Sequence, residues 1–173
     1  RGVNVTVSVS CFVPKPFTPF QWEAQDTLEE LERKQQLLKS EIKTGKISYK
    51  YHDARVSRIE AVFARGDRKL CKAMLEAFNR GMMLDGWDEY FDYEKWLEVF
   101  AGCGIDPAFY ANRAFGVDEL LPWDFIDIGV TKKFMRNEYE KAHSAVTTPD
   151  CRTKCSGCGA SRLCDGDCVC KGR

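Results

Sequence analysis

The stretch VNVTVSVSCFV, residues 3–13, decides the fold at the start of the chain. Its odd positions carry valine or cysteine, and its even positions carry Asn, Thr, Ser, Ser and Phe. An alternation with period two and this much valine predicts a β-strand with one apolar face. The other face, lined by small hydroxyl and amide groups, fits either an edge that faces water or a barrel strand that faces a polar cavity. The pattern alone leaves both interpretations open.

A stiff, extended loop is expected after this strand, because Pro14, Pro16 and Pro19 cannot donate hydrogen bonds to a neighbouring strand. A second short strand is expected at residues 47–51, where apolar and aromatic residues again occupy every second position.

Between the two strands, the sequence predicts an amphipathic helix from about residue 27 to residue 44. Asp26 is the expected N-cap, Glu29 reaches back to it as in a capping box, and Gly45 follows the helix end. A narrow leucine and isoleucine stripe indicates that one side of this helix packs on the rest of the chain.

The region from residue 53 to residue 145 is expected to be mostly helical, because acidic caps and glycine stops recur along it. The expected helices cover residues 54–65, 68–80 after Asp67 and 93–101 after Asp92. A short helix is opened by Asp106 and Pro107, and another runs from Thr131 to about residue 145.

The composition bounds the class of protein. With 173 residues, the chain has room for one ordinary domain with or without a tail, at roughly 100–200 residues per domain. Lysine and arginine total 26, as do aspartate and glutamate, so the net charge is zero and no overall field attracts nucleic acid. No run approaches the roughly 20 apolar residues of a membrane helix, so we expect a soluble chain with no membrane partner.

The sequence begins at Arg1 and enters the strand at once, so we expect the natural N-terminus to lie further upstream.

The segment DGWDEYFDYEKWLEVF, residues 85–100, is dense in aromatic side chains. Nucleic acid bases stack on such surfaces in some proteins. Here six carboxylates accompany the rings and would repel phosphate, and only one lysine would attract it. We therefore expect these rings to form a core, and nucleic acid is disfavoured as a partner.

Cysteines gather at the C-terminal end, where six of the nine lie in the last 23 residues. Thiolates with short spacers can converge on one zinc ion or iron–sulfur cluster, and clustering at one end is a poor disulfide framework. We therefore expect a reducing, cytoplasmic compartment and a metal-binding tail. The predicted ligands are Cys151, Cys155, Cys158 and Cys164, with Cys168 and Cys170 as alternatives for the fourth.

Other catalytic candidates are few. His52 and His143 are the only histidines, and each is expected on the surface rather than as a base. Cys71 and Cys103 fall in helical segments and are expected to be buried and inert. No phosphate-binding loop or nucleophile elbow is present in the sequence.

Several blocks resemble one family of large radical S-adenosylmethionine (radical SAM) proteins that carry an N-terminal cobalamin-binding domain. The block VSVSCFVPKPFTPFQW, residues 7–22, looks like their last barrel strand and the loop after it. Four further blocks look like their C-terminal extension and come in the same order: EAVFARGDRKL at 60–70, DGWDEYFDYEKWLEVF at 85–100, LPWDFIDIGVTKKFMRNEYEKA at 121–142, and TTPDCRTKCSGCGA at 147–160.

This resemblance implies an α/β fragment that is mostly α: the last strand of a partial (β/α) barrel, a helical C-terminal extension and a Cys-rich tail. The segments would be a strand and Pro-rich loop at 1–22, a linking helix at 23–45, a helical extension at 46–146 and a tail at 147–173. The cobalamin-binding domain and most of the barrel would lie upstream as partners within the same protein. Ser8, Ser10 and the Pro14–Pro19 loop would lie near the cosubstrate or the substrate.

Two departures from the family pattern matter. Phe17 stands where the family would have histidine, and the residues after Ala160 have no counterpart. Although Cys151, Cys155 and Cys158 share the spacing of the catalytic radical SAM triplet, that motif comes early in a barrel, whereas only 15 residues follow Cys158. A cluster in the tail is therefore interpreted as an auxiliary 4Fe-4S cluster.

Two hypotheses from different classes follow. In the first, the chain is the C-terminal segment of a radical SAM iron–sulfur oxidoreductase with an unknown substrate, using S-adenosylmethionine in the full-length protein, with cobalamin use left open. The segment alone would be inactive. In the second, the chain is a non-enzymatic helical interaction module with a structural zinc tail. A third hypothesis, RNA binding through the tail, has less support, because the net charge of +3 on the tail would give RNA affinity only a shallow dependence on salt.

Overall fold

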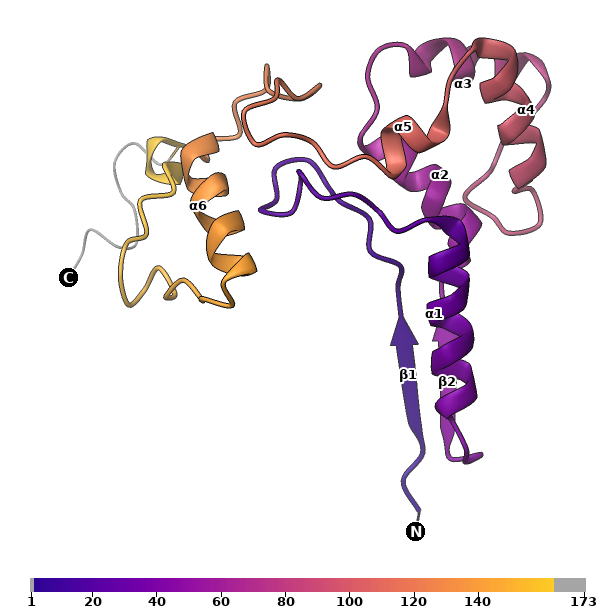
Figure 1. The fold of residues 1–173 in the computed structure, drawn as a ribbon, viewed down its shortest axis with the longest axis horizontal. Coiled ribbons are helices and arrows are strands. Elements are labelled where there is room, and N and C mark those ends of the chain that lie inside the picture. Colours follow the sequence, from indigo (N-terminus) through magenta and orange to yellow (C-terminus); the bar gives the residue numbers. More distant parts are fainter. Residues whose placement is uncertain (1, 164–173) are drawn as a thin grey trace. The chain divides into compact units, whose positions relative to one another are not determined.

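The computed structural model describes residues 2–163. Within this range the chain forms a mostly helical α/β fold with six α-helices and a parallel sheet of two strands, which confirms the coarse fold class (Figure 1). The elements are β1 Val5–Val9, α1 Leu28–Glu41, β2 Ile47–Tyr51, α2 Ala54–Ala64, α3 Leu70–Asn79, α4 Tyr93–Cys103, α5 Pro107–Ala111, α6 Lys132–His143 and the short 3-10 helix η1 Ala160–Leu163.

The chain divides into two compact units, each described here by itself. Within the described residues, unit 1 consists of residues 2–14 and 24–114, and unit 2 consists of residues 15–23 and 115–163. Unit 1 therefore holds both strands and helices α1 to α5, whereas unit 2 holds α6 and η1.

The two strands of unit 1 form a β–α–β arrangement with α1 as the connection. β1 and β2 run parallel, with Val5 opposite Ile47 and Val9 opposite Tyr51. The valines of β1 thus share one face with the apolar residues of β2. Gln35 of α1 donates from Nε2 to Cys11 Sγ and to the His52 carbonyl, at 3.4 and 2.8 Å, which ties α1 to the residues that follow the carboxyl ends of the two strands.

The opposite face of the strand pair is polar and exposed. Thr6 and Ser8 of β1 stand opposite Ser48 and Lys50 of β2, and all four are exposed. β1 is shorter than the predicted strand at 3–13, because its partner β2 ends at Tyr51, opposite Val9.

The N-terminus of α1 is capped differently from the prediction. Thr27 is the N-cap, and its hydroxyl accepts a hydrogen bond from Glu30 N at 3.3 Å. Asp26, the predicted cap, instead pairs with Lys34 Nζ at 2.5 Å. Threonine one residue later is also a favoured cap, and the pattern could not distinguish the two positions.

The remaining helices of unit 1 pack around one core. α2 packs against α5, and α3 packs against α4. Tyr93, Trp96 and Phe100 are buried there, as expected from the aromatic segment, whereas Trp87 and Tyr90 from the same segment are exposed. The aromatic core prediction is therefore correct for helix α4 and wrong for the loop before it.

A single arginine binds the end of α5. Arg65 is completely buried, and its guanidinium donates to the carbonyl oxygens of Tyr110, Ala111 and Arg113 at 2.6, 2.9 and 2.6 Å. These carbonyls lie at the C-terminal end of a helix of five residues, where helical partners are lacking.

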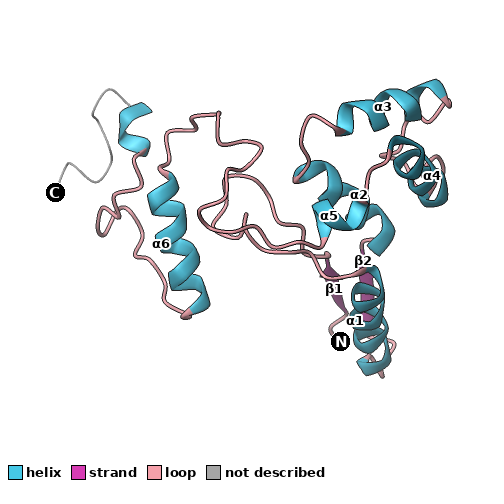
Figure 2. Cartoon of the chain, turned by 45° about the horizontal axis from the view of Figure 1, so that its top comes forward, coloured by secondary structure: helices cyan, strands magenta, loops and turns pink. Residues whose placement is uncertain are grey.

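Unit 2 is built mostly from loops (Figure 2). Its core consists of Trp22 from the first segment and Phe115, Leu121, Trp123 and Met135 from the second. A backbone hydrogen bond of 2.8 Å from Phe115 N to the Trp22 carbonyl joins the two segments.

None of the helices among residues 2–163 combines the length and the apolar composition that crossing a membrane requires.

We expect replacement of Arg65 with methionine to lower the free energy of unfolding by about 3–5 kcal/mol, because three buried carbonyls lose a charged donor. Urea denaturation followed by circular dichroism measures the change. The exposed Arg68 is the matched control, and Arg68→Met should stay within about 0.5 kcal/mol of the wild type. Equal effects of the two substitutions would contradict the role given to Arg65.

Tyr110 provides a test by pH. Burial, followed by the hydrogen bond from its hydroxyl to Asp67 Oδ1 at 3.0 Å, raises the pKa of Tyr110 to about 12. Since this lies above the unfolded value of about 10, the contribution to stability is complete below pH 10 and is lost as the pH rises towards 12. In an ultraviolet titration of the tyrosines, Tyr110→Phe should remove the last step. Loss of a step near pH 10 would contradict the assignment.

Candidate functional site

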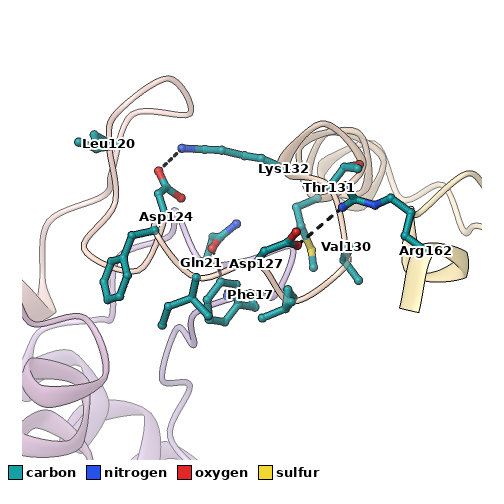
Figure 3. A pocket seen from close by; sticks show the side chains of 13 residues that line it. Phe17, Gln21, Leu120, Asp124, Asp127, Val130, Thr131, Lys132 and Arg162 are labelled. Carbon is teal, nitrogen blue, oxygen red and sulfur yellow. Dashed lines mark hydrogen bonds and ion pairs between the residues drawn. The ribbon is translucent and has the colours of Figure 1, made fainter. Parts of the chain in front are cut away.

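A cavity of about 530 Å³ lies within unit 2. The loop 15–23, the segment 120–132, the first turns of α6 and η1 all contribute to its lining (Figure 3). The lining residues are Phe17, Gln21, Leu120, Asp124, Phe125, Ile126, Asp127, Ile128, Val130, Thr131, Lys132, Met135 and Arg162.

Gln21 connects the two segments that enclose the cavity. Its side chain is 4% exposed, and its Oε1 accepts a hydrogen bond of 2.7 Å from Trp123 Nε1 and one of 3.2 Å from Phe17 N. Phe17 adopts a left-handed backbone with φ of 59°, which is uncommon for a residue other than glycine. Such strained positions are concentrated at functional sites.

Two cations at the cavity are each paired with a carboxylate. Lys132 Nζ donates to Asp124 Oδ2 at 2.5 Å and to the Glu119 carbonyl at 3.0 Å. Arg162 lies 3.7 Å from Asp127 Oδ1 and donates to the Gly129 carbonyl at 3.5 Å. The four ionised side chains therefore sum to zero charge.

The Cys-rich segment is attached to the same wall. The Cys158 carbonyl accepts a hydrogen bond of 2.9 Å from Thr131 N, and Thr131 is both a lining residue and the N-cap of α6. Gly159 follows with φ of 99°, and a Cβ there would lie 2.9 Å from the Gly129 carbonyl oxygen. Glycine therefore permits the close approach of the two backbones.

A second attachment lies before the first cysteine of this segment. The Thr148 hydroxyl donates to Glu138 Oε1 at 2.6 Å, and Lys141 Nζ donates to the same carboxylate at 2.9 Å. These hydrogen bonds, with that from Thr148 the largest cause, lower the pKa of Glu138. The segment from Thr148 to Gly159 is thus tied to the rest of unit 2 at both ends.

The thiols between these attachments are free. Cys151 and Cys155 are exposed, and Cys158 is half-buried. Among residues 2–163, no group of three His, Cys, Asp or Glu side chains lies close enough together to hold a metal ion. Cys164, the predicted fourth ligand, and its alternatives Cys168 and Cys170 lie outside the described residues. The donor chemistry suits a soft metal or cluster, because all the candidate ligands are thiols.

Other candidates from the sequence are found at separate places. His52 and His143 are both exposed, as expected, and His143 Nε2 lies 2.7 Å from Glu23 Oε1. Cys103 is half-buried, but Cys71 is exposed, and its predicted burial is wrong. Leu70, Ala73 and Ala77 form the buried face of α3, and this leaves Cys71 on the exposed side.

A second, open hollow of about 720 Å³ lies in unit 1, next to the residues that follow the carboxyl end of β2. Tyr51, His52, Arg55 and Tyr93 are among its lining residues. The carboxyl ends of parallel strands are the usual position of ligand sites in α/β folds.

Sequence reasoning missed the polar residues of the first cavity. Gln21 and Lys132 lie inside blocks that the resemblance covers, but no role was expected for them there, and these two residues and Arg162 are far apart along the chain. The nearest signal was the Pro-rich loop, which was expected near a substrate and which contributes Phe17 to the lining.

Comparison with known proteins adds no identification. No protein-family model matches the chain, and neither a curated protein nor a solved structure matches it.

The attachment at Cys158 can be tested with two glycines that both have positive φ. A Cβ on Gly157 would meet nothing within 4 Å, so Gly157→Ala should cost only the left-handed backbone preference, about 1 kcal/mol. Gly159→Ala should cost about 2–3 kcal/mol, because its Cβ meets the Gly129 carbonyl and Thr131. Hydrogen exchange of the Thr131 amide reports the difference. Equal exchange in the two variants would show that this attachment is absent.

Proposed function

We propose that the chain is the C-terminal segment of a radical SAM iron–sulfur enzyme and that its Cys-rich tail binds an auxiliary 4Fe-4S cluster. The observation that carries the proposal is the β1–α1–β2 unit, in which two parallel strands are joined by a helix. This is the repeating unit of (β/α) barrels, so β2, and not β1 as the resemblance implies, would be the last strand of the partial barrel. A complete barrel of about 250 residues would not fit in this chain.

The two faces of the strand pair support this interpretation. In a barrel, the helices cover the outer face of the strands and the inner face points to the interior. Here the valines of β1 lie on one face of the strand pair, and Thr6, Ser8, Ser48 and Lys50 occupy the other. A polar inner face suits a partial barrel that encloses a polar cosubstrate. The Pro-rich loop that follows β1 would then belong to the substrate side of the barrel.

The proposed cluster ligands are Cys151, Cys155, Cys158 and Cys164. Exposed free thiols at the first two positions, and a left-handed backbone at Gly157, support a segment that can rearrange around a metal. Metal binding and local folding are commonly coupled, so the ligands need not be gathered beforehand. A bound iron–sulfur cluster would supply electron transfer. S-adenosylmethionine, and cobalamin if it is used, would bind to upstream parts of the same protein, and the segment alone would be inactive.

A structural zinc tail on a helical interaction module is the second candidate. The observation that favours it is a group of large apolar side chains left exposed on α3 and in the loop after it. These are Met74, Leu75, Phe78, Met83, Leu84, Trp87 and Tyr90. Exposed apolar side chains that are close together mark interaction surfaces.

Anaerobic reconstitution with iron and sulfide tests the choice. We expect about four irons per chain, with visible absorption, and loss of the iron when Cys151, Cys155 and Cys158 are all changed to serine. The matched control changes Cys11, Cys71 and Cys103 to serine, and it should keep the iron. Zinc at about one equivalent without iron would favour the second candidate, and equal iron in both variants would reject the tail as a metal site.

A further inference from the structure

The Gln21 amide presents a fixed hydrogen-bond donor to the cavity of unit 2. Because Oε1 accepts from both Trp123 Nε1 and Phe17 N, the orientation of the amide is set, with Nε2 on the other side. In Figure 3 the nitrogen end points into the space among the lining residues Asp124, Asp127 and Lys132. Nε2 has no acceptor among residues 2–163, although the side chain is 4% exposed. Nε2 is not among the buried unpaired atoms of the described residues and is open to solvent, so a ligand acceptor that replaced water there would add about one net hydrogen bond.

The charges around the cavity do not favour a charged ligand. Lys132 is held by Asp124 and by a backbone carbonyl, and Arg162 is paired with Asp127. Because each cation already has a carboxylate partner, the cavity offers a charged ligand no net opposite charge, and a neutral ligand leaves both pairs intact.

The volume of the cavity and its apolar walls indicate the size and the apolar character of the ligand. A volume of about 530 Å³ suits a small molecule, because ligand pockets usually measure roughly 300–1,000 Å³. Two aromatic rings, Phe17 and Phe125, and the aliphatic residues Ile126 and Ile128 form apolar walls. Phe125 is 75% exposed, as expected for a ring at the mouth that a ligand would cover.

We propose that this cavity binds a small, neutral molecule with a planar apolar body and one carbonyl-type acceptor, which receives a hydrogen bond from Gln21 Nε2. This site is separate from the proposed metal ligands and goes beyond the proposed function.

The test uses 1-indanone as the probe. Indane, which has the same ring system without the carbonyl oxygen, is the matched control compound. Binding to the full 173-residue chain is followed by nuclear magnetic resonance, through the Trp123 indole N–H and the Gln21 side-chain amide. We expect saturable shifts of both signals with 1-indanone, and an affinity for 1-indanone about tenfold higher than for indane, as for one buried hydrogen bond.

Gln21→Glu is the decisive variant. A carboxylate still accepts hydrogen bonds from Trp123 and Phe17 but has no N–H to donate, so the preference for 1-indanone over indane should disappear at neutral pH. Gln36→Glu, the same change at an exposed position of α1, should leave the preference intact. If Gln21→Glu disturbs the fold, as judged by the Trp123 signal, Ile126→Trp tests the site instead. The Ile126→Trp variant keeps Gln21 and narrows the mouth of the cavity, so it should abolish binding of both 1-indanone and indane.

Failure of this proposal can be told apart from failure of the proposed function. Measured without added metal, the variant with serine at Cys151, Cys155 and Cys158 should bind 1-indanone like the wild type, because none of these side chains lines the cavity. Equal binding of 1-indanone and indane to the wild type, no binding of either, or an undiminished preference in a folded Gln21→Glu protein would each overturn the proposal.

Discussion

Unit 2 depends on the hydrogen bond from Trp123 Nε1 to Gln21 Oε1, which joins residues 102 positions apart at 2.7 Å. Little regular structure holds this unit together, because α6 and η1 are its only helices within the described residues. The buried Gln21 side chain therefore sets the positions of loop 15–23 and of the segment after Phe115. The same hydrogen bonds fix the left-handed Phe17 and turn the Gln21 amide nitrogen towards the cavity. One side chain thus shapes the fold and the proposed binding site.

Unit 1 depends on a different constraint, the need to cover one face of two parallel strands. Helix α1 is tied to the residues that follow the two strands, and the hydroxyl face remains exposed. Parallel strands normally occur in larger sheets with both faces covered by other elements, and a parallel sheet of two strands is much smaller than these. The proposal that these strands belong to a partial barrel accounts for the exposed valines as well as for the polar face. Val5 and Val7 are 48% and 38% exposed and would pack on neighbouring elements.

Local sequence patterns predicted the helices and strands well, but they could not predict contacts between residues that are far apart in the sequence. Period two at residues 5–9 and the acidic caps Asp92 and Asp106 located strands and helices, because these signals act over a few residues, whereas the predicted cap Asp67 is not the N-cap of α3. The buried guanidinium of Arg65 and the amide of Gln21 bind partners more than 40 residues away, and nothing in the local sequence marks them. The cavity could not be predicted for the same reason. The metal ligands stay a prediction, since Cys164 lies outside the described residues.

The central claim, that residues 15–23 and 115–163 form one cooperative unit organised by Gln21, is tested most directly by native-state hydrogen exchange. The Phe17 amide, the Phe115 amide and the Trp123 indole N–H each donate a hydrogen bond between or within these segments. Groups that open together exchange with the same free energy of opening. We expect the three protons to share one value in the wild type. Clearly different values, with Phe17 exchanging as in an unstructured loop, would contradict the account.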